Sequence, residues 1–169
     1  MAEAAMQLNR TADQRMVVGI GEFAVASTPD CMIVTHALGS CVAVCIWDPV
    51  AGVAGLLHIL LPDSRINPER AAQQPGAFAD TGIPVLFRSA YAQGAVKSRC
   101  KVQLIGGAEV TITGGQAIGK RNVLAARAML WQNGVKVERE VTGGAAARSV
   151  WLSAETGEVQ VTTAGVRVA

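Results

Sequence analysis

Residues 35–64 carry two side chains suited to nucleophilic chemistry, within the sequence THALGSCVAVCIWDPVAGVAGLLHILLPDS. Cys41 offers a thiol and His58 offers an imidazole. A thiolate is a strong nucleophile, but a free cysteine is mostly protonated at neutral pH. An imidazole within reach can take the thiol proton and hold the thiolate as an ion pair. Cys41 and His58 are therefore a candidate catalytic dyad, provided that the fold brings them together.

A third group normally fixes the tautomer of such an imidazole. The hydroxyls of Thr35 and Ser40 are the candidates, because no nearby carboxylate is obvious apart from Asp63. His36 competes as the base because it lies close to the thiol in sequence. It falls in an expected turn, where an exposed polar residue needs no special role. We therefore prefer His58.

Structural and metal-binding interpretations compete with the dyad. A cysteine among valines and alanines is commonly a small buried hydrophobe, and a lone histidine is commonly structural. Cys45 shares a strand face with Cys41, so these thiols and His58 could hold a metal. The spacing is not C-x-x-C and no fourth ligand is evident, so no metal is expected. Gly106-Gly107 and Gly114-Gly115 complete no phosphate-binding pattern, so we expect no cofactor and assign these pairs to tight turns or close backbone approach.

A β-hairpin is the element that must position the dyad. Asp48 followed by Pro49 is a preferred start of a type I turn. If residues 48–51 form a four-residue loop, Trp47 faces Gly52 and the same register places Cys41 directly opposite His58. Opposed residues of an antiparallel pair have Cβ atoms roughly 5 Å apart. A slip of one residue would send the two side chains to opposite faces of the sheet.

Both faces of this hairpin are apolar. One face is expected to carry Val42, Val44, Ile46, Val53, Leu57 and Ile59, and the other Ala43, Cys45, Trp47, Ala54 and Leu56. A two-sided apolar hairpin belongs in the middle of a sheet that other elements cover on both sides.

The rest of the chain mixes strands and helices without regular alternation, which favours α+β over a doubly wound sheet. Strands are expected at 15–27, 31–35, 101–105, 135–141, 148–152 and 159–163, a bend at 36–40 and an irregular polar loop at 65–76. Asp80 is expected to cap a helix that ends near 91–93 before Gly94, with Pro84 in its first turn. A second helix at 121–132, stopped by Gly134, shows an apolar stripe. Leu124, Ala128 and Trp131 form this stripe, and Val123 and Leu130 widen it.

The composition of the 169 residues, half of them hydrophobic, fits one compact domain with a mixed β-sheet core flanked by helices. Residues 1–14 read as a flexible leader and residues 15–169 as the domain. A net charge of +2 with 4% aromatic residues lacks the footprint of a nucleic-acid binder. No apolar run is long enough to span a membrane and no signal peptide is evident, so we expect a cytoplasmic protein whose four cysteines are thiols.

The motifs along the chain resemble those of the chemoreceptor glutamine deamidases, the CheD family of chemotaxis. They are GIGEFAV at 19–25, T-x-x-LGSC at 35–41, the Asp-Pro turn, HILLPDS at 58–64, FADTGI at 78–83, IGGA at 105–108, IGKRN at 118–122, and TGG followed by ARSV within 142–150. His36 and Ala37 depart from the expected pattern, and the loop 65–76 is particular to this chain.

The resemblance implies a protein-glutamine deamidase that acts on helices of methyl-accepting chemotaxis receptors through a cysteine thioester. It assigns the nucleophile to Cys41, the histidine to His58 and the orienting threonine to Thr35. The Cys41 N–H, presented by the bend at Gly39 and Ser40, is the expected oxyanion donor. The implied fold is similar to the catalytic domain of the cytotoxic necrotizing factor toxins.

Two further expectations concern partners. The resemblance implies a second partner, a CheC-type phosphatase that imitates the substrate. The alternative function is a non-catalytic binding module that regulates such a phosphatase or a receptor and retains the dyad with little turnover.

Overall fold

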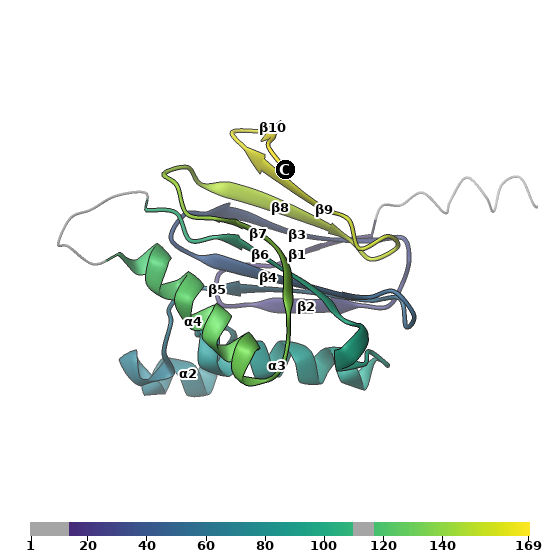
Figure 1. The fold of residues 1–169 in the computed structure, drawn as a ribbon, viewed down its shortest axis with the longest axis horizontal. Coiled ribbons are helices and arrows are strands. Elements are labelled where there is room, and N and C mark those ends of the chain that lie inside the picture. The colour runs from purple at the N-terminus through teal and green to yellow at the C-terminus, as the bar shows by residue number, and fades with distance from the viewer. Residues whose placement is uncertain (1–13, 110–116) are drawn as a thin grey trace, which may run out of the picture.

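The computed structural model describes residues 14–109 and 117–169, and in these residues the chain forms two five-stranded sheets and three α-helices (Figure 1). The first sheet has the order β1 (Gln14–Val17), β3 (Cys31–Leu38), β8 (Arg148–Ser153), β9 (Val159–Thr163) and β10 (Val166–Arg167). The second has the order β2 (Phe23–Ala26), β5 (Val53–Ile59), β4 (Val42–Asp48), β6 (Lys101–Gly106) and β7 (Val137–Thr142). The leader expected at 1–14 lies outside the described residues up to position 13, and β1 begins at Gln14.

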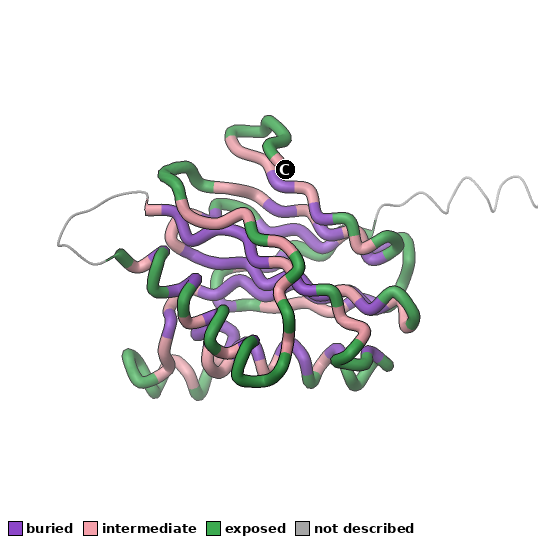
Figure 2. The backbone as a smooth tube through the Cα atoms, in the orientation of Figure 1, coloured by how far each residue is buried: buried purple, intermediate pink, exposed green. Residues whose placement is uncertain are grey.

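The molecule has three layers. The helices α3 (Ala79–Ala92) and α4 (Ile118–Gln132) cover one face of the second sheet, and the first sheet covers its other face (Figure 1). Buried residues accordingly gather along the central strands (Figure 2). The α+β class expected from the sequence is confirmed.

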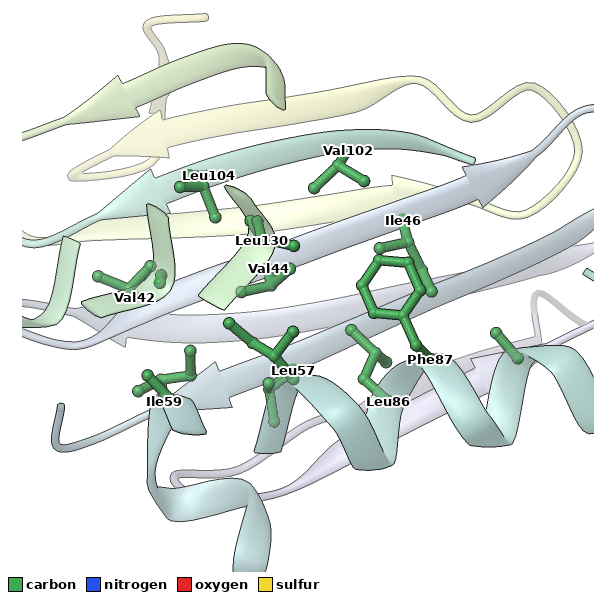
Figure 3. Packing of buried hydrophobic residues seen from close by; sticks show 14 of the residues in the cluster. Val42, Val44, Ile46, Leu57, Ile59, Leu86, Phe87, Val102, Leu104 and Leu130 are labelled. Atoms are coloured by element: carbon green, nitrogen blue, oxygen red, sulfur yellow. The ribbon is translucent and has the colours of Figure 1, made fainter. Parts of the chain in front are cut away.

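The β4–β5 hairpin lies at the centre of the second sheet, between β2 and β6, as its two apolar faces predicted. Val44 and Leu57 point toward the helices, where they pack with Leu86 of α3 and Leu130 of α4 (Figure 3). The opposite face, which includes Cys45, packs against the first sheet. Each fully buried leucine or valine contributes roughly 1.5–3 kcal/mol, so the hairpin is a main source of stability.

The predicted register of the hairpin is wrong by two residues. Asp48 pairs with Val53, and His58 pairs with Ala43 instead of Cys41. The loop is therefore 49–52, because Asp48 is the last paired residue of β4 while its carboxylate already accepts hydrogen bonds from loop N–H groups. An even shift leaves every side chain on its predicted face.

The N-terminal strands differ most from expectation. The strand predicted at 15–27 is two strands, β1 and β2, which belong to different sheets. The chain turns between them at Gly21, whose φ of +76° favours glycine. The strand predicted at 31–35 continues to Leu38, through a bulge in which Ala37 has a φ of +56°, so the bend is confined to Gly39 and Ser40.

The segment predicted as an irregular loop at 65–76 is largely helical. It contains η1 (Ser64–Ile66), α2 (Pro68–Gln73) and most of η2 (Pro75–Ala77), and the Asn67 side chain caps α2. Asp80 is not the cap of α3. Its carboxylate instead accepts hydrogen bonds from the backbone and hydroxyl of Ser64, which holds this segment against the helix.

Helix α3 is confirmed up to its stop at Gly94, but it begins two residues earlier than predicted. Because its N-cap is Phe78, Pro84 lies inside the helix and not in its first turn. A short 3-10 turn, η3 (Lys97–Arg99), connects it to β6. The strands β6, β7, β8 and β9 match their predictions to within two residues at each end.

Helix α4 is confirmed, but it begins at Ile118, three residues earlier than predicted. Val123 and Leu130 are buried as expected, whereas the central stripe predicted at Leu124, Ala128 and Trp131 is wrong. Leu124 is 50% exposed and Trp131 is 80% exposed. The helix instead buries Gly119, Asn122, Val123, Ala126 and Leu130. Apolar spacing alone does not reveal this buried face, because the start of the helix places a glycine and an asparagine there instead of large apolar residues.

Candidate functional site

Thr35 and His58 meet between the two sheets. Thr35 is on β3 of the first sheet and His58 is near the end of β5 in the second, and both side chains are buried. The Thr35 Oγ1 lies 2.8 Å from His58 Nδ1 and 2.7 Å from the Val18 carbonyl oxygen. The threonine therefore connects the imidazole to the backbone of the other sheet.

This pair of hydrogen bonds defines the tautomer of His58. A carbonyl oxygen can only accept, so the single hydroxyl proton of Thr35 goes to Val18. Toward the imidazole the hydroxyl must then accept, which places a proton on Nδ1. The proton-free nitrogen of the neutral ring is Nε2, and it is buried without a hydrogen-bond partner among the described residues. The arrangement leaves a base atom free.

Cys41 lies immediately before β4 and is 6% exposed. It shares its face with Ala43, the residue opposite His58. The two candidate groups are therefore diagonal neighbours, not directly opposed ones. Diagonal side chains of a regular antiparallel pair lie about 7 Å apart, within reach of a modest side-chain movement.

The backbone carbonyls of Gly39, Ser40 and Cys41 each accept a hydrogen bond, and these three bonds hold the bend that carries the thiol. Gly107 N–H donates to the Cys41 carbonyl at 2.8 Å, and Ala108 N–H donates to that of Gly39 at 2.8 Å. The Ser40 carbonyl accepts from the Asn122 side chain at 2.9 Å. Among the described residues, neither Ser40 nor Cys41 uses its own N–H for a backbone carbonyl outside the regular strands and helices.

The other sequence candidates lie elsewhere. His36 is exposed on β3, with Nδ1 3.2 Å from Ser149 Oγ and its ring edge-on to Trp151, so it does not replace His58. Asp63 binds Arg65 near the surface. In the described part of the chain, the only hydroxyl that hydrogen-bonds to His58 is that of Thr35. The Ser40 alternative is therefore not supported.

Burial sets the proton affinity of both reactive groups. It lowers the pKa of His58 from 6.5 to about 4. Burial also raises the pKa of the Cys41 thiol, and the Cys41 N–H only partly offsets this. Both shifts favour the neutral forms, so the resting site holds a thiol and a neutral imidazole. This differs from the preformed ion pair considered from the sequence.

Cys45 lies deeper on the same strand face. Burial raises its pKa to about 12, although the charge of Arg139 acts in the opposite direction. Residues 14–109 and 117–169 contain no cluster of three or more histidine, cysteine or acidic side chains that could hold a metal. Gly106 and Gly107 have positive φ values at a tight approach of backbone segments, as expected, whereas Gly114 and Gly115 lie outside the described residues.

Asn122 is the site-adjacent residue that the sequence argument missed. Its Nδ2 donates to the carbonyls of Ser40 at 2.9 Å and Leu60 at 3.0 Å. The side chain is fully buried, and its Oδ1 has no partner among the described residues. The small and apolar residues at helical spacing from Gly119 to Leu130 were the signal that could have placed it inward.

The fold and these groups define a two-sheet α+β protein with the side-chain set of thiol-dependent hydrolases: a thiol, a free imidazole nitrogen and a group that orients the ring. A family model described as CheD chemotactic sensory transduction matches residues 60–163. The chain belongs to the CheD family.

Relatives over nearly the whole chain support this assignment. The chain is 44% identical to probable chemoreceptor glutamine deamidase CheD 1 of Syntrophus aciditrophicus, covering 89% of this chain and 94% of the relative. It is 46% identical to probable chemoreceptor glutamine deamidase CheD 2 of Anaeromyxobacter dehalogenans, covering 86% and 92%. Chemoreceptor glutamine deamidase CheD of Thermotoga maritima is 42% identical, with 89% and 93% covered.

A solved structure, the hypothetical protein YfiH of Bacillus licheniformis, is 12% identical to the chain. It aligns at a TM-score of 0.47 over 77% of this chain and 59% of its own, so it adds nothing to the functional argument. In the described residues, no helix has the length and apolarity to cross a membrane.

Proposed function

We propose that this protein is a protein-glutamine deamidase that converts glutamine side chains of chemoreceptors to glutamate and releases ammonia. The observation that carries the proposal is the His58 tautomer, which leaves Nε2 free on the strand face shared with Cys41. The names of the CheD relatives supply the substrate class.

The first half of the reaction forms a thioester. His58 Nε2 takes the Cys41 proton while the sulfur attacks the amide carbon of the glutamine side chain. The carbonyl electrons move to oxygen and form a tetrahedral intermediate. The imidazolium then donates its Nε2 proton to the departing nitrogen, the C–N bond breaks, and ammonia leaves.

The second half hydrolyses the thioester. Neutral His58 takes a proton from water, and the resulting hydroxide attacks the thioester carbon. The C–S bond breaks, a glutamate side chain is released, and the sulfur regains a proton. Thr35 keeps the proton on Nδ1 throughout, so the same nitrogen, Nε2, serves as base and acid in both halves.

The lowered pKa of His58 suits this cycle. At neutral pH the ring is an unprotonated base, and once charged in its buried setting it is a strong acid toward the leaving nitrogen. The Cys41 N–H is the proposed donor to the oxyanion. Outside the regular strands and helices of the described residues, this N–H donates to no backbone carbonyl, and it lies beside the thiol.

The proposed substrate is a helix of a receptor's signalling region in the cytoplasm. A second proposed partner is a CheC-type phosphatase that presents a surface similar to that helix. The proposed reaction uses no cofactor, because the substrate amide, the thiol, the imidazole and water supply all of its atoms.

Incubation with purified receptor cytoplasmic fragments tests the proposal through ammonia release and peptide mapping by mass spectrometry. Cys41→Ala should lower the rate on the order of 10⁴-fold or more, because it removes the nucleophile. Cys45→Ala, a matched control on the same face, should retain most of the activity. Continued glutamine conversion by Cys41→Ala would exclude this nucleophile, and tight binding of the fragment without turnover by the wild type would favour the binding module.

A further inference from the structure

The hairpin ladder does not itself fix the position of Cys41. Its last pair on this side is Val42 with Ile59, and beyond this pair the chain leaves β4 at Cys41 and β5 at Leu60. The thiol therefore lies just outside the regular sheet. Contacts from outside the hairpin must set its distance from His58, which is inside the ladder: Gly107 N–H holds the Cys41 carbonyl, and Asn122 holds that of Ser40.

Asn122 spans the place where the two strands part. Its amide nitrogen donates one proton to the Ser40 carbonyl and the other to the Leu60 carbonyl. Carbonyl oxygens only accept, so the atom between them must be the nitrogen and not the oxygen of the amide. One amide group thus joins the residue before Cys41 to the residue two positions after His58.

Close backbone packing places Asn122 at this point. A Cβ atom on Gly119 would lie 2.6 Å from the carbonyl oxygens of both Gly107 and Ala108. A Cβ on Gly107, whose φ is +65°, would lie 2.3 Å from a methyl group of Val123. Both glycines are needed for the first turn of α4 to touch the loop that also binds the Cys41 bend.

The burial of Asn122 is costly without a compensating role. Its Oδ1 has no partner among the described residues, and a buried unsatisfied polar atom costs roughly 1–3 kcal/mol. The same residues leave only one other buried side-chain nitrogen or oxygen unsatisfied, the Nε2 of His58. Both exceptions therefore belong to this one site.

We propose that Asn122 is a positioning residue, which holds the Cys41 bend at a fixed distance from His58 Nε2. The inference rests on the proposed deamidase reaction for its kinetic part, but its geometric part concerns the free protein alone. Asn122 acts through backbone carbonyls and does not touch the substrate.

The test compares Asn122→Ala, Asn122→Ser and isosteric Asn122→Asp with the wild type. Asn133→Ala is the matched control, since Asn133 donates to the Met129 carbonyl at the exposed end of the same helix. Deamidation of the receptor fragment gives kcat and KM. Alkylation of Cys41 by iodoacetamide, mapped by mass spectrometry across a pH series, reports the thiol environment without substrate, and His58→Asn provides the reference for an uncoupled thiol.

The expected result is a fall in kcat of about 10- to 100-fold in Asn122→Ala and Asn122→Asp, the size associated with a displacement near 1 Å. KM should change by less than about threefold, because substrate contacts remain. The pH profile of Cys41 alkylation should move toward that of His58→Asn. Asn122→Ser, which retains one donor, should give an intermediate loss, and Asn133→Ala should match the wild type.

A folded Asn122 variant with wild-type kcat and alkylation profile would overturn the proposal. Failure of all three variants to fold would also overturn it, by reducing Asn122 to a folding role. If the wild type deamidates no receptor fragment, the proposed function fails, whereas the alkylation profiles still decide the positioning role.

Discussion

The two ends of the β4–β5 hairpin treat buried polar groups in opposite ways. At the turn end, where Asp48 pairs with Val53, the buried carboxylate accepts from Arg99 and from the N–H groups of Val50, Ala51 and Val96. At the site end, near the pair of Val42 and Ile59, the buried His58 and Asn122 each keep one polar atom without a partner among the described residues. The polar cluster at the turn end therefore has all its hydrogen bonds made (the saturated cluster), whereas the cluster at the site end does not.

This difference suits the turn end to stabilising the fold and the site end to reactivity. Burial alone would raise the pKa of Asp48, but Arg99 and the three N–H groups hold it well below its usual value. Within residues 14–109 and 117–169, no charged partner offsets the burial of His58, and this burial lowers its pKa to about 4. A charge that is fully bonded in the resting fold anchors the turn, whereas a base atom left free can accept a substrate-linked proton.

Among the variants that compare the two ends of the hairpin, His58→Asn at the site end should have the largest effect. Asparagine can still donate to the Thr35 hydroxyl but offers no base at the Nε2 position. The deamidation rate should fall on the order of 10³- to 10⁴-fold, while the free energy of unfolding changes by less than about 1.5 kcal/mol. Steady-state kinetics and urea denaturation on one preparation check both halves, and a loss of stability that matched the loss of rate would remove the contrast between the two ends.

Asp48→Ala should produce the reverse pattern at the turn end. Removal of this carboxylate leaves Arg99 and three backbone donors without their acceptor, at a cost of about 3–5 kcal/mol. The rate per folded molecule should stay near that of the wild type. Denaturant unfolding measures the loss, and Asp63→Ala, at a more exposed ion pair with Arg65, should cost clearly less stability than Asp48→Ala. Equal losses in the two variants would contradict the saturated cluster at Asp48.

On acidification, the two ends of the hairpin should lose their contributions to folding stability at different pH values. The unfolded chain protonates His58 near pH 6.5, but the folded chain does so only near pH 4. Between these values the unfolded state binds more protons, so stability falls as the pH drops through this window, by on the order of 3 kcal/mol. The carboxylate of Asp48 contributes stability that is lost only below its ordinary pKa of 3.8.

Urea denaturation at a series of pH values measures this loss. His58→Asn should abolish the part between pH 6.5 and pH 4, whereas His36→Gln, which changes the exposed histidine on β3, should leave it intact. An unchanged acid response in His58→Asn would assign the effect to other groups.

The smallest expected effect comes from Thr35→Val, which keeps the side-chain shape but removes the hydroxyl. The Val18 carbonyl and His58 Nδ1 then lose their shared partner, at a cost of about 1–3 kcal/mol. The rate should fall about 10-fold or more, because the ring is no longer held in the productive tautomer. Thr35→Ser should restore both, and a Thr35→Val protein as active as the wild type would show that the tautomer does not depend on this hydroxyl.

The sequence by itself determined the hairpin and the partition of its faces, and it singled out Cys41 and His58 as candidates. The hairpin follows from local information, an Asp-Pro turn signal between two apolar runs, and its faces follow from the alternation of side chains along a strand. The exact register did not follow, because turn residues alone do not say whether Asp48 belongs to the loop or to the last pair. Face assignment survived the error because the shift was even.

Tertiary structure decided the rest. The hydrogen bond from His58 to Thr35 joins two different sheets, and no local pattern encodes which sheet faces which. The inward rotation of α4 depends on a close approach at Gly119 that only the packed loop defines. From its residue type alone, Asn122 would be expected at the surface. The close approach at Gly119 buries it beside the Cys41 bend. Long-range contacts, not residue type or period, therefore determine the tautomer of His58, the proposed base, and the placement of Cys41, the proposed nucleophile.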